Sequence, residues 1–573
     1  MMSHLSRLHP QALNQTPTNE QSQNHTPSKD TISHPSGSRS MVQSTLQIKK
    51  LRSEEINCRI IDEKLALMLA IDYQPFCMLE DTGFKMFVEA LCSDYKIPDK
   101  RKIRYDVMPR LYKLASAKLK DILQIIEHVS LTCDMWSSRN MEAFLTVTAH
   151  FCHDGILRSC VLNTIAVPES HTADNLAERL NAILIEWNIK EKVVSVVTDN
   201  VTNMIKMCSL LELRHMPCFA HMLNLLVQQS LNLPELADLT KKCKDIAKFF
   251  HKSNVGHEAL KREQLDRNPD KLPLKLIQEV PTRWNSYYYM FKRILELSDY
   301  LAVVQRRLPQ APALINLEEE NILRDVVALL DIFEQATKMI SADQYPTSSL
   351  IIPIIHGLYH NLAEIRPNIK SDVGLALFSK LKDNMSHRLL EYEKRTVCKI
   401  ATFLHPVFRD SFRHLENKQA AKEAVKAELN NLMRTIIMSD AADANNVTST
   451  ENETACSQQS NRDKLPKLFS FLKKKEVPRL EHTGASAINV LKMYVETAYA
   501  GEHSNVIKDF WDLNKHLKPL DKLAKKYLIV PGTSVRSERV FSATGYIIND
   551  RRNSLKADAV EMICFLNQNQ WLL

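Results

Sequence analysis

Two aspartates lie where this chain could build a site for divalent cations. Asp134 closes the alternating, strand-like segment "HVSLTCDMW", and Asp199 closes the apolar segment "KVVSVVTDN". Crossovers that return to a parallel strand are almost always right-handed, so both carboxylates would emerge at one sheet edge if the two strands are neighbours. Carboxylate oxygens suit Mg²⁺ or Mn²⁺, and pairs of such ions ~4 Å apart cleave phosphodiesters. The alternative is that each aspartate only ends a strand and caps the next segment of chain.

A third carboxylate, Glu538, lies near the end of the chain in "SVRSERVFSATG". Thr533 or Ser534 is a suitable cap for a helix that begins there. The helical neighbours of Glu538 include no basic residue that could form a salt bridge with it; they are Ser534, Val535, Phe541 and Ser542. A partly buried carboxylate on such a face needs a partner, a proton or a metal ion. The alternative is a solvated surface glutamate.

Length and composition limit the class of protein. A chain of 573 residues predicts two or three domains, and only 10 glycines favour helices over turn-rich β architecture. The net charge of +8 permits a nucleic-acid partner without demanding one. No apolar run approaches a membrane span or resembles a signal peptide, so we expect an intracellular protein without a membrane partner. The 12 cysteines are scattered without a C-x-x-C pair, so we expect reduced thiols and no structural zinc.

The hydrophobic pattern divides the chain into five segments. A polar tail is expected to be disordered, and a helical region comes after it. Strand-like segments then alternate with helices in the order β-β-β-α-β-α-β-α, which predicts three antiparallel strands followed by parallel ones. The next segment is mainly helical with a flexible loop at about 439–463, and the end returns to helix. The predicted boundaries are 1–50, 51–127, 128–235, 236–500 and 501–573.

In three predicted helices the apolar residues recur at helical spacing and so fall on one face. In "TADNLAERLNAILIEWNI" this face comprises Leu176, Leu180, Ile183, Leu184 and Trp187. In "MPRLYKLASAKLKDILQII" it comprises Leu111, Leu114, Leu119, Ile122 and Ile125. In "KADAVEMICFLNQNQWLL" it comprises Ala559, Met562, Ile563 and Leu566.

Six motifs occur in order between residues 65 and 573: "QPFCMLEDTGFKMFVEAL", "LTCDMWSSRN", "VVTDNVTNM", "CFAHMLNLLVQ", "VPTRWNSYYYM" and "PLDKLAKKYLIVPGTSVRSERVFSATGYIINDRRNSL". Together they resemble the hAT superfamily of DNA transposases and its domesticated descendants, particularly the BED-type zinc-finger group. The resemblance implies an α-rich α/β fold, in which a large helical insertion interrupts an RNase H-like core. It also implies a C-terminal hAT dimerisation region that completes the core.

The resemblance assigns roles to particular residues. It implies that Asp134, Asp199 and Glu538 form the acidic triad that binds Mg²⁺ or Mn²⁺ in a DDE-type transposase. His221, in the C-x-x-H motif, is implied to lie near the active site and to contact DNA. The alternative for Cys218-x-x-His221 is a packing cysteine and a hydrogen-bonded histidine.

The resemblance also assigns a role to the Arg283-Trp284 pair, at the cleaved DNA end. Trp284 is implied to stack on a flipped base, a contact that tolerates any sequence. The alternative is a tryptophan that belongs to the hydrophobic core.

The chain departs from the family pattern in two places. In "ATFLHPVFRD", His405 and Val407 replace the Asp and Arg of an L-D-P-R motif, which would loosen a contact in the insertion. The BED finger that reads transposon ends in the family is not found, since residues 1–57 contain no cysteine.

These observations lead to two possible functions. The intact triad favours a metal-dependent enzyme that cleaves and joins DNA strands. The missing finger favours a domesticated or non-autonomous nuclear protein that binds DNA and forms homodimers or higher homo-oligomers. We expect the second function, and the sequence leaves enzymatic activity open.

Overall fold

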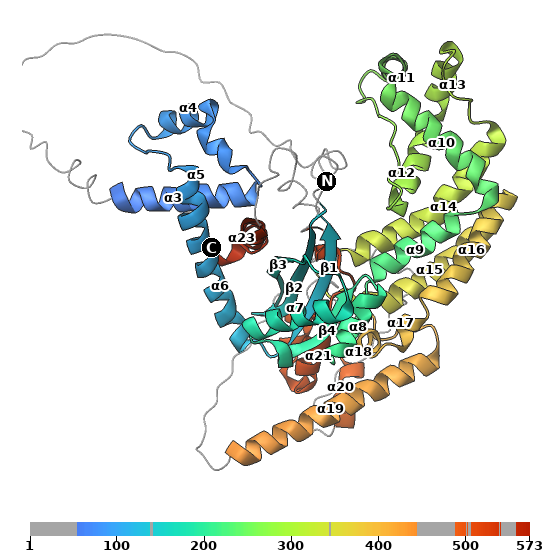
Figure 1. Ribbon diagram of the computed structural model, residues 1–573. Helices are drawn as coiled ribbons and strands as arrows, with labels where there is room; N and C mark the ends of the chain where they lie inside the picture. Colours follow the sequence, from blue (N-terminus) through green and yellow to red (C-terminus); the bar gives the residue numbers. More distant parts are fainter. Residues whose placement is uncertain are drawn as a thin grey trace, which may run out of the picture. The chain divides into compact units, whose positions relative to one another are not determined.

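A mixed five-stranded sheet carries the two aspartates (Figure 1). Its strand order is β3-β2-β1-β4-β5; β1, β2 and β3 pair antiparallel, whereas β4 pairs parallel with both β1 and β5. The predicted order of three antiparallel strands followed by parallel ones is therefore confirmed, as is the α-rich α/β fold class. The strands are β1 (Val129–Ser137), β2 (Ala143–His153), β3 (Ile156–Ala166), β4 (Val193–Thr198) and β5 (His215–Pro217).

The computed structural model describes residues 54–137, 141–342, 345–443, 487–499, 501, 506–537, 539 and 557–573. The chain divides into two units, Met1–Cys58 and Arg59–Leu573, and of the first only the start of one helix is described. The predicted tail 1–50 and the carboxylate of Glu538 lie outside the described residues.

Two helices connect the parallel strands. Thr172 caps α7 by accepting a hydrogen bond from the Asn175 amide at 3.3 Å. The predicted apolar face of this helix is buried throughout, from Leu176 to Trp187, so that prediction is confirmed. The elements are α7 (Ala173–Glu186), η4 (Lys190–Lys192), α8 (Thr202–Leu210) and, after β5, α9 (Phe219–Leu231).

The helices before the sheet include the predicted helix α6, in which not all of the regularly spaced apolar residues are buried. In α6, Leu114 and Ile125 are 50% and 71% exposed. The buried side instead runs through residues four apart or nearly so, with a small alanine among them: Met108, Leu111, Ala115, Leu119 and Leu123. The elements are α3 (Glu54–Ile71), η2 (Phe76–Glu80), α4 (Thr82–Leu91), α5 (Lys100–Lys102), η3 (Ile103–Val107) and α6 (Met108–Ile125).

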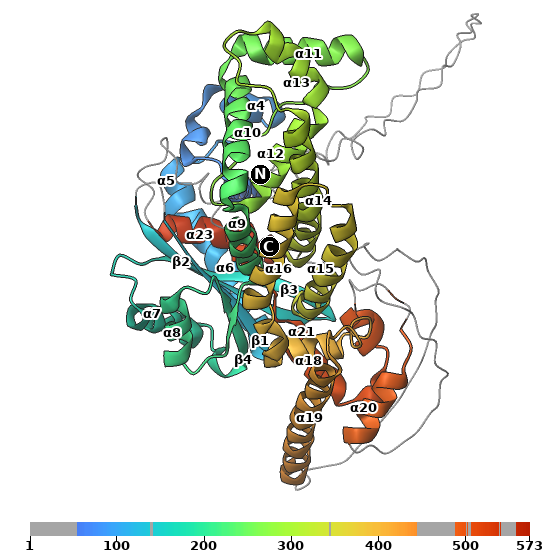
Figure 2. The same cartoon turned by 90° about the vertical axis from the view of Figure 1, so that its right-hand side faces the viewer.

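A long helical segment comes after α9, and Figure 2 shows its helices α10, α12 and α14 side by side. Asn316 and Glu319 form a capping box at the start of α14, and Glu319 also forms an ion pair with Lys242 of α10 at 2.6 Å. The elements are α10 (Pro234–Lys252), α11 (Asn254–Arg267), α12 (Trp284–Glu296), α13 (Ser298–Arg307), α14 (Leu317–Ile340), η5 (Ser348–Leu350), α15 (Ile351–Ile365), η6 (Arg366–Asn368), α16 (Asp372–Arg388), α17 (Glu391–Lys394), α18 (Thr396–Leu404), α19 (Leu415–Asp443) and α20 (Ala487–Glu496).

Helix α19 runs through Asp443, past position 439 where the sequence places the start of the flexible loop. The rest of that predicted loop lies outside the described residues. His405, in the departing "LHPV" motif, is fully buried, and its ring centroid lies 4.5 Å from that of Phe408. Nearby, Arg409 donates to the backbone carbonyls of Tyr494 and Thr497 at 2.7 and 3.0 Å, which joins the end of α18 to α20.

The C-terminal elements return to the sheet. Helix α23 packs against β3 and α6, and Asn567 at its end donates to the carbonyls of Ala70 and Ile71 in α3. These elements are η8 (Ile507–Trp511), η9 (Lys515–Leu517), α21 (Leu520–Leu528), α23 (Ala557–Gln568) and η10 (Gln570–Leu572).

Two hydrophobic cores meet at the sheet. Val196 belongs to the core with α6, α7 and α23, whereas its neighbour Val197 belongs to the core with the inserted helices and α21. Adjacent residues of a strand point to opposite faces, so each face of β4 is buried in a different core. This double burial explains the nearly continuous apolar sequence of β4.

Candidate active site at the carboxyl edge of the sheet

The register of β1 and β4 brings the two predicted aspartates together. Leu131 pairs with Val196, and Thr132 pairs with Val197. The printed pairs end there; continued for two more residues, this register would set Asp134 of β1 opposite Asp199, the residue after β4, on strands about 4.8 Å apart. The fourth strand lies beside the first, as the predicted convergence of the two aspartates requires.

The turn after β4 holds Asp199 in place. Its Oδ1 accepts a hydrogen bond from the Val201 amide at 3.3 Å, and Asn200 between them has a φ of 70°. Asparagine tolerates this left-handed conformation better than most residues, so the sequence Asp-Asn suits the turn. Thr198, just before it, contacts the Nε2 of His215 at 2.9 Å, and burial lowers the pKa of His215 to about 4. The turn is therefore supported by a neutral imidazole at physiological pH.

Asp134 lies on a polar strip in an otherwise apolar part of the sheet. Its side chain is 6% exposed, and its pairing partner on β2 is Thr146. Trp136, on the same face, donates its indole N–H to Thr146 Oγ1 at 3.1 Å and stacks on Phe144 with centroids 4.6 Å apart. The Trp of the T-x-D-x-W motif thus packs against β2 and helps to hold β1, the strand that carries Asp134, in place.

The C-terminal segment reaches this strip across more than 400 residues of sequence. The hydroxyl of Ser537 lies 2.8 Å from that of Thr132 and 3.4 Å from that of Thr148. Thr132 points to the same side of β1 as Asp134, two residues later. Residues 535–537 are helical, as predicted, and Thr533, Ser534 and Ser537 are buried. Glu538 is the next residue in the sequence but lies outside the described residues.

Gly532 lets that segment approach the core closely. Its amide donates to Thr347 Oγ1 at 2.8 Å, and its carbonyl accepts from the amide of Phe219 at 3.0 Å. A Cβ at this position would lie 2.9 Å from Ile340 Cδ1 and 3.1 Å from the Thr347 carbonyl oxygen. A larger residue would push the segment away from Ile340 and Thr347, so the Pro-Gly pair positions it as well as turning it.

The C-x-x-H motif begins helix α9 beside the same edge. The Cys218 amide donates to the Thr198 carbonyl at 2.7 Å, and the buried Cys218 sulfur accepts a hydrogen bond from the Ser534 amide at 3.3 Å. This geometry favours the packing interpretation of Cys218. His221 lies in the first turn of α9 and is half-buried. Within the described ranges, no three His, Cys, Asp or Glu side chains gather as a metal-binding group.

The Arg-Trp pair is held by α9. Asn224 accepts a hydrogen bond from the Trp284 amide at 3.1 Å and donates to the Thr282 carbonyl, which places the pair one turn along from His221. Arg283 is exposed, but Trp284 is 1% exposed and belongs to the core. In this conformation its ring is not accessible to a base, so the observed burial favours the core interpretation.

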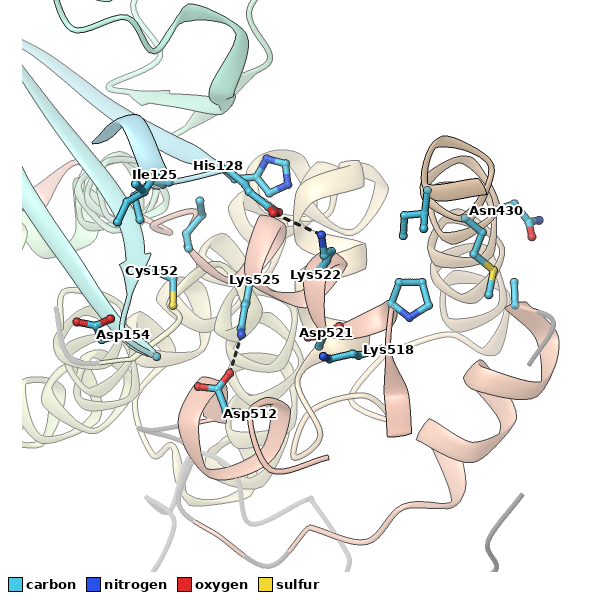
Figure 3. A pocket seen from close by; sticks show the side chains of 18 of the residues that line it. Ile125, His128, Cys152, Asp154, Asn430, Asp512, Lys518, Asp521, Lys522 and Lys525 are labelled. Atoms are coloured by element: carbon cyan, nitrogen blue, oxygen red, sulfur yellow. Dashed lines mark hydrogen bonds and ion pairs between the residues drawn. The ribbon is translucent and has the colours of Figure 1, made fainter. Parts of the chain in front are cut away.

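A large cavity lies between the start of β1 and helices α19 and α21 (Figure 3). It has a volume of 1440 Å³ and begins beside His128, at the opposite end of β1 from Asp134. Two ion pairs cross it, from Lys522 to Glu127 at 3.4 Å and from Lys525 to Asp512 at 2.6 Å. Its charges are mostly paired, and we assign no chemistry to it.

Family models match three parts of the chain, of which the first two overlap. The ZBED1 RNase-like domain matches residues 132–222, the ZBED1 RNase-like helical domain matches 216–327, and the hAT family C-terminal dimerisation region matches 491–570. The first match contains both aspartates and the C-x-x-H motif, and the second contains Arg283 and Trp284. In the part of the chain that the structure describes, every helix is too short or too polar to cross a bilayer.

Curated relatives cover most of the chain. It is 25% identical over 533 residues to the human zinc finger BED domain-containing protein 4, covering 89% of this chain and 43% of that protein. It is 24% identical over 539 residues to the Putative AC transposase of Zea mays, covering 88% of this chain and 64% of that protein. It is 22% identical over 548 residues to the human zinc finger BED domain-containing protein 6, covering 89% of this chain and 55% of that protein. The chain thus spans less than two thirds of each of these relatives.

The sheet topology, the helical segment that separates the core from its C-terminal part and these matches agree with one another. They support the origin of this chain from a hAT transposase.

Proposed function

We propose that this protein is a nuclear, DNA-binding protein that forms homo-oligomers through its hAT dimerisation region. The observation that carries the proposal is the retained carboxylate edge of an RNase-like sheet, with Asp134 and Asp199 in register beside the helix that bears His221. With divalent cations bound to its carboxylates, such an edge can lie against a phosphate backbone, and the exposed Arg283 is available to neutralise phosphates. Binding of this kind reads backbone charge and little sequence.

Fluorescence anisotropy with labelled 20-base-pair duplexes of unrelated sequence tests this proposal. We expect similar affinities for the different sequences and a loss of at least tenfold between 50 and 200 mM salt, because neutralised phosphates release their counterions. No binding at 50 mM salt would refute DNA binding. A tight complex with one sequence that persists at 200 mM salt would contradict the proposed lack of selectivity.

A second candidate function, metal-dependent cleavage and joining of DNA strands, is favoured by the contact between Ser537 and Thr132. Glu538 is the next residue after Ser537, so this contact supports Glu538 as the third carboxylate beside Asp134 and Asp199. Oxygen donors of this kind fit Mg²⁺ or Mn²⁺. When bound, such ions activate the attacking oxygen and stabilise the leaving one. The turn at Asp199 and the burial of Asp134 would fix two ligands before any ion arrives.

Thermal unfolding with and without divalent ions tests the metal site. Clustered carboxylates repel one another, and an ion that binds only the native state raises its melting temperature. We expect Mn²⁺ at 100 times its dissociation constant to stabilise the protein by about 2.7 kcal/mol. Asp134→Asn should remove most of this response, whereas Asp154→Asn, in the distant β2–β3 turn, should keep it. An identical response in both variants would show that Asp134 is not a ligand.

Nicking of a supercoiled plasmid in Mn²⁺ then separates the two functions. Nicking that is lost in Glu538→Gln and Asp199→Asn would establish the enzyme. A metal response without nicking would favour the DNA-binding protein alone.

A further inference from the structure

A second cavity lies among the helices that come after the carboxylate edge. It has a volume of 640 Å³, within the usual range for a ligand site, and is bounded by the end of α9, the first half of α10 and one side of α12. Tyr287 and Phe291 supply aromatic surface, and Gln228 supplies an amide. Its charged lining residues are Lys241 and Lys244, and no carboxylate is among the described residues that line it.

The lysines of this cavity belong to a longer row on α10. Lys241, Lys244, Lys248 and Lys252 fall within an arc of about 80° and span roughly 17 Å along the helix axis. Lys248 and Lys252 line a neighbouring hollow of 330 Å³, together with Asp245. Three of the four are exposed and form no ion pair with a described carboxylate; they are Lys241, Lys248 and Lys252.

The remaining lysine, Lys244, holds the ring of Tyr287 in place. Lys244 Nζ lies over the ring of Tyr287, 4.9 Å from its centroid, and donates to the Tyr287 hydroxyl at 3.2 Å. It also pairs with Glu279 at 3.6 Å, so its own charge is partly neutralised. Tyr287 is half-buried, and its ring is held before any ligand binds. A rigid aromatic face beside unpaired ammonium groups is the combination that binds a base together with its phosphate.

Helix α9 connects this cavity to the carboxylate edge. Its first residue, Phe219, comes directly after Cys218, whose amide bonds to Thr198, and Gln228 and Leu231 near its other end line the cavity. The helix has 13 residues, so the two sites are about 18 Å apart along its axis, or about five nucleotide steps of a DNA strand. Gln228 also donates to the Pro281 carbonyl at 3.0 Å, which fixes the loop before Trp284 at the cavity rim.

We infer that this cavity binds an unpaired nucleotide of a DNA strand, with its base against Tyr287 and the flanking phosphates along the lysines of α10. The inference rests on the proposed DNA binding and specifies its substrate class, DNA with a single-stranded segment a few nucleotides from the carboxylate edge. It places base stacking on a partly accessible tyrosine instead of the buried Trp284. Charge complementarity favours this cavity over the larger one, where four carboxylates offset the four lysine and arginine side chains of the lining: Glu127, Asp154, Asp512 and Asp521.

Binding of two labelled DNAs tests the inference, one fully duplex and one of the same duplex with a five-nucleotide single-stranded extension. Tyr287→Leu retains apolar packing but loses the aromatic ring, so it should weaken binding of the extended DNA about fivefold or more and leave the duplex unchanged. Lys241→Ala with Lys248→Ala should weaken both DNAs and lower the salt dependence. The matched control is Lys380→Ala with Lys382→Ala, which removes two exposed lysines from α16 and should bind like wild type.

Photo-crosslinking supplies a readout that does not depend on the stability of the variants. An extension containing 5-iododeoxyuridine should crosslink wild-type protein to the peptide that contains Tyr287, and excess free mononucleotide should not compete. Crosslinks found only elsewhere, or α10 variants that bind like the α16 control, would overturn the inference while DNA binding itself survives. Efficient competition by the mononucleotide would overturn the assignment to a DNA strand. Absence of all DNA binding by wild type would refute the proposed function and this inference together.

Discussion

At the scale of single residues, the carboxyl group of Glu561 links stability to pH. It lies between α23 and the sheet, where Asn163 donates to it at 2.8 Å and the hydroxyl of Tyr112 lies 3.4 Å away. Burial raises the pKa of Glu561 above its usual value, and the hydrogen bond from Asn163 opposes this only in part. Because the folded pKa exceeds the unfolded one, folding favours the protonated form. The stability from this group is present at low pH and is lost as pH rises through the raised pKa.

We therefore predict that Glu561→Gln stabilises the protein near neutral pH, since the neutral amide can still accept from Asn163 without a charge to bury. Urea unfolding between pH 5 and 8 should show a gain that grows with pH until the carboxyl group of the wild type is fully ionised. Glu178→Gln, on the exposed side of α7, is the matched control and should show no such trend. A constant difference across this range would mean that ionisation of Glu561 does not oppose folding.

At the scale of elements, the buried face of a helix was predictable where large apolar residues form it. It was not predictable where a small residue forms part of it. The face of α7 was predictable because five bulky residues recur at helical spacing, and all five are buried. In α6 the same counting was less successful, because the buried face runs through Ala115, whereas Leu114 is half exposed. Alanine carries little hydrophobic signal but allows close packing, so periodicity of bulky residues alone does not locate the buried face.

The candidate site divides in the same way. The neighbouring strands and their aspartates were predictable, because two strand-like segments each ended in Asp and one crossover joined them. The docking of Ser537 on Thr132 was not predictable, since short hydroxyl side chains have no long-range sequence signal. The burial of Trp284 did have a sequence signal, because Trp284, Tyr288 and Phe291 recur at helical spacing. All three are buried. Here the periodicity was a better guide to the ring's environment than the motif.

At the scale of the whole molecule, the apolar side of the last helix serves the folding of its own chain. Ala559, Ile563 and Leu566 are at most 2% exposed, and α23 packs against α6 and β3 of the same chain. This surface therefore cannot also be free for a second copy in the described conformation. Within the matched dimerisation region, the described large apolar residues that remain exposed are Val495 and Leu513, at 39% and 72%. Self-association through this region should thus depend on different residues from those that complete the fold.

This division gives a prediction that separates folding from assembly. Ile563→Asp places a charge in the core, so it should cost at least about 3 kcal/mol and lower the melting temperature sharply. Leu513→Asp changes a residue in contact with solvent, so it should leave the melting temperature unchanged and raise the dimer dissociation constant at least tenfold. Light scattering at micromolar concentration measures the mass of each variant. Leu272→Asp is the control, because Leu272 is 87% exposed but lies outside the matched region, and it should remain dimeric. A wild-type protein that scatters as a monomer would refute the dimer. A Leu513→Asp protein of full dimer mass would place the contact between copies on other residues of the region.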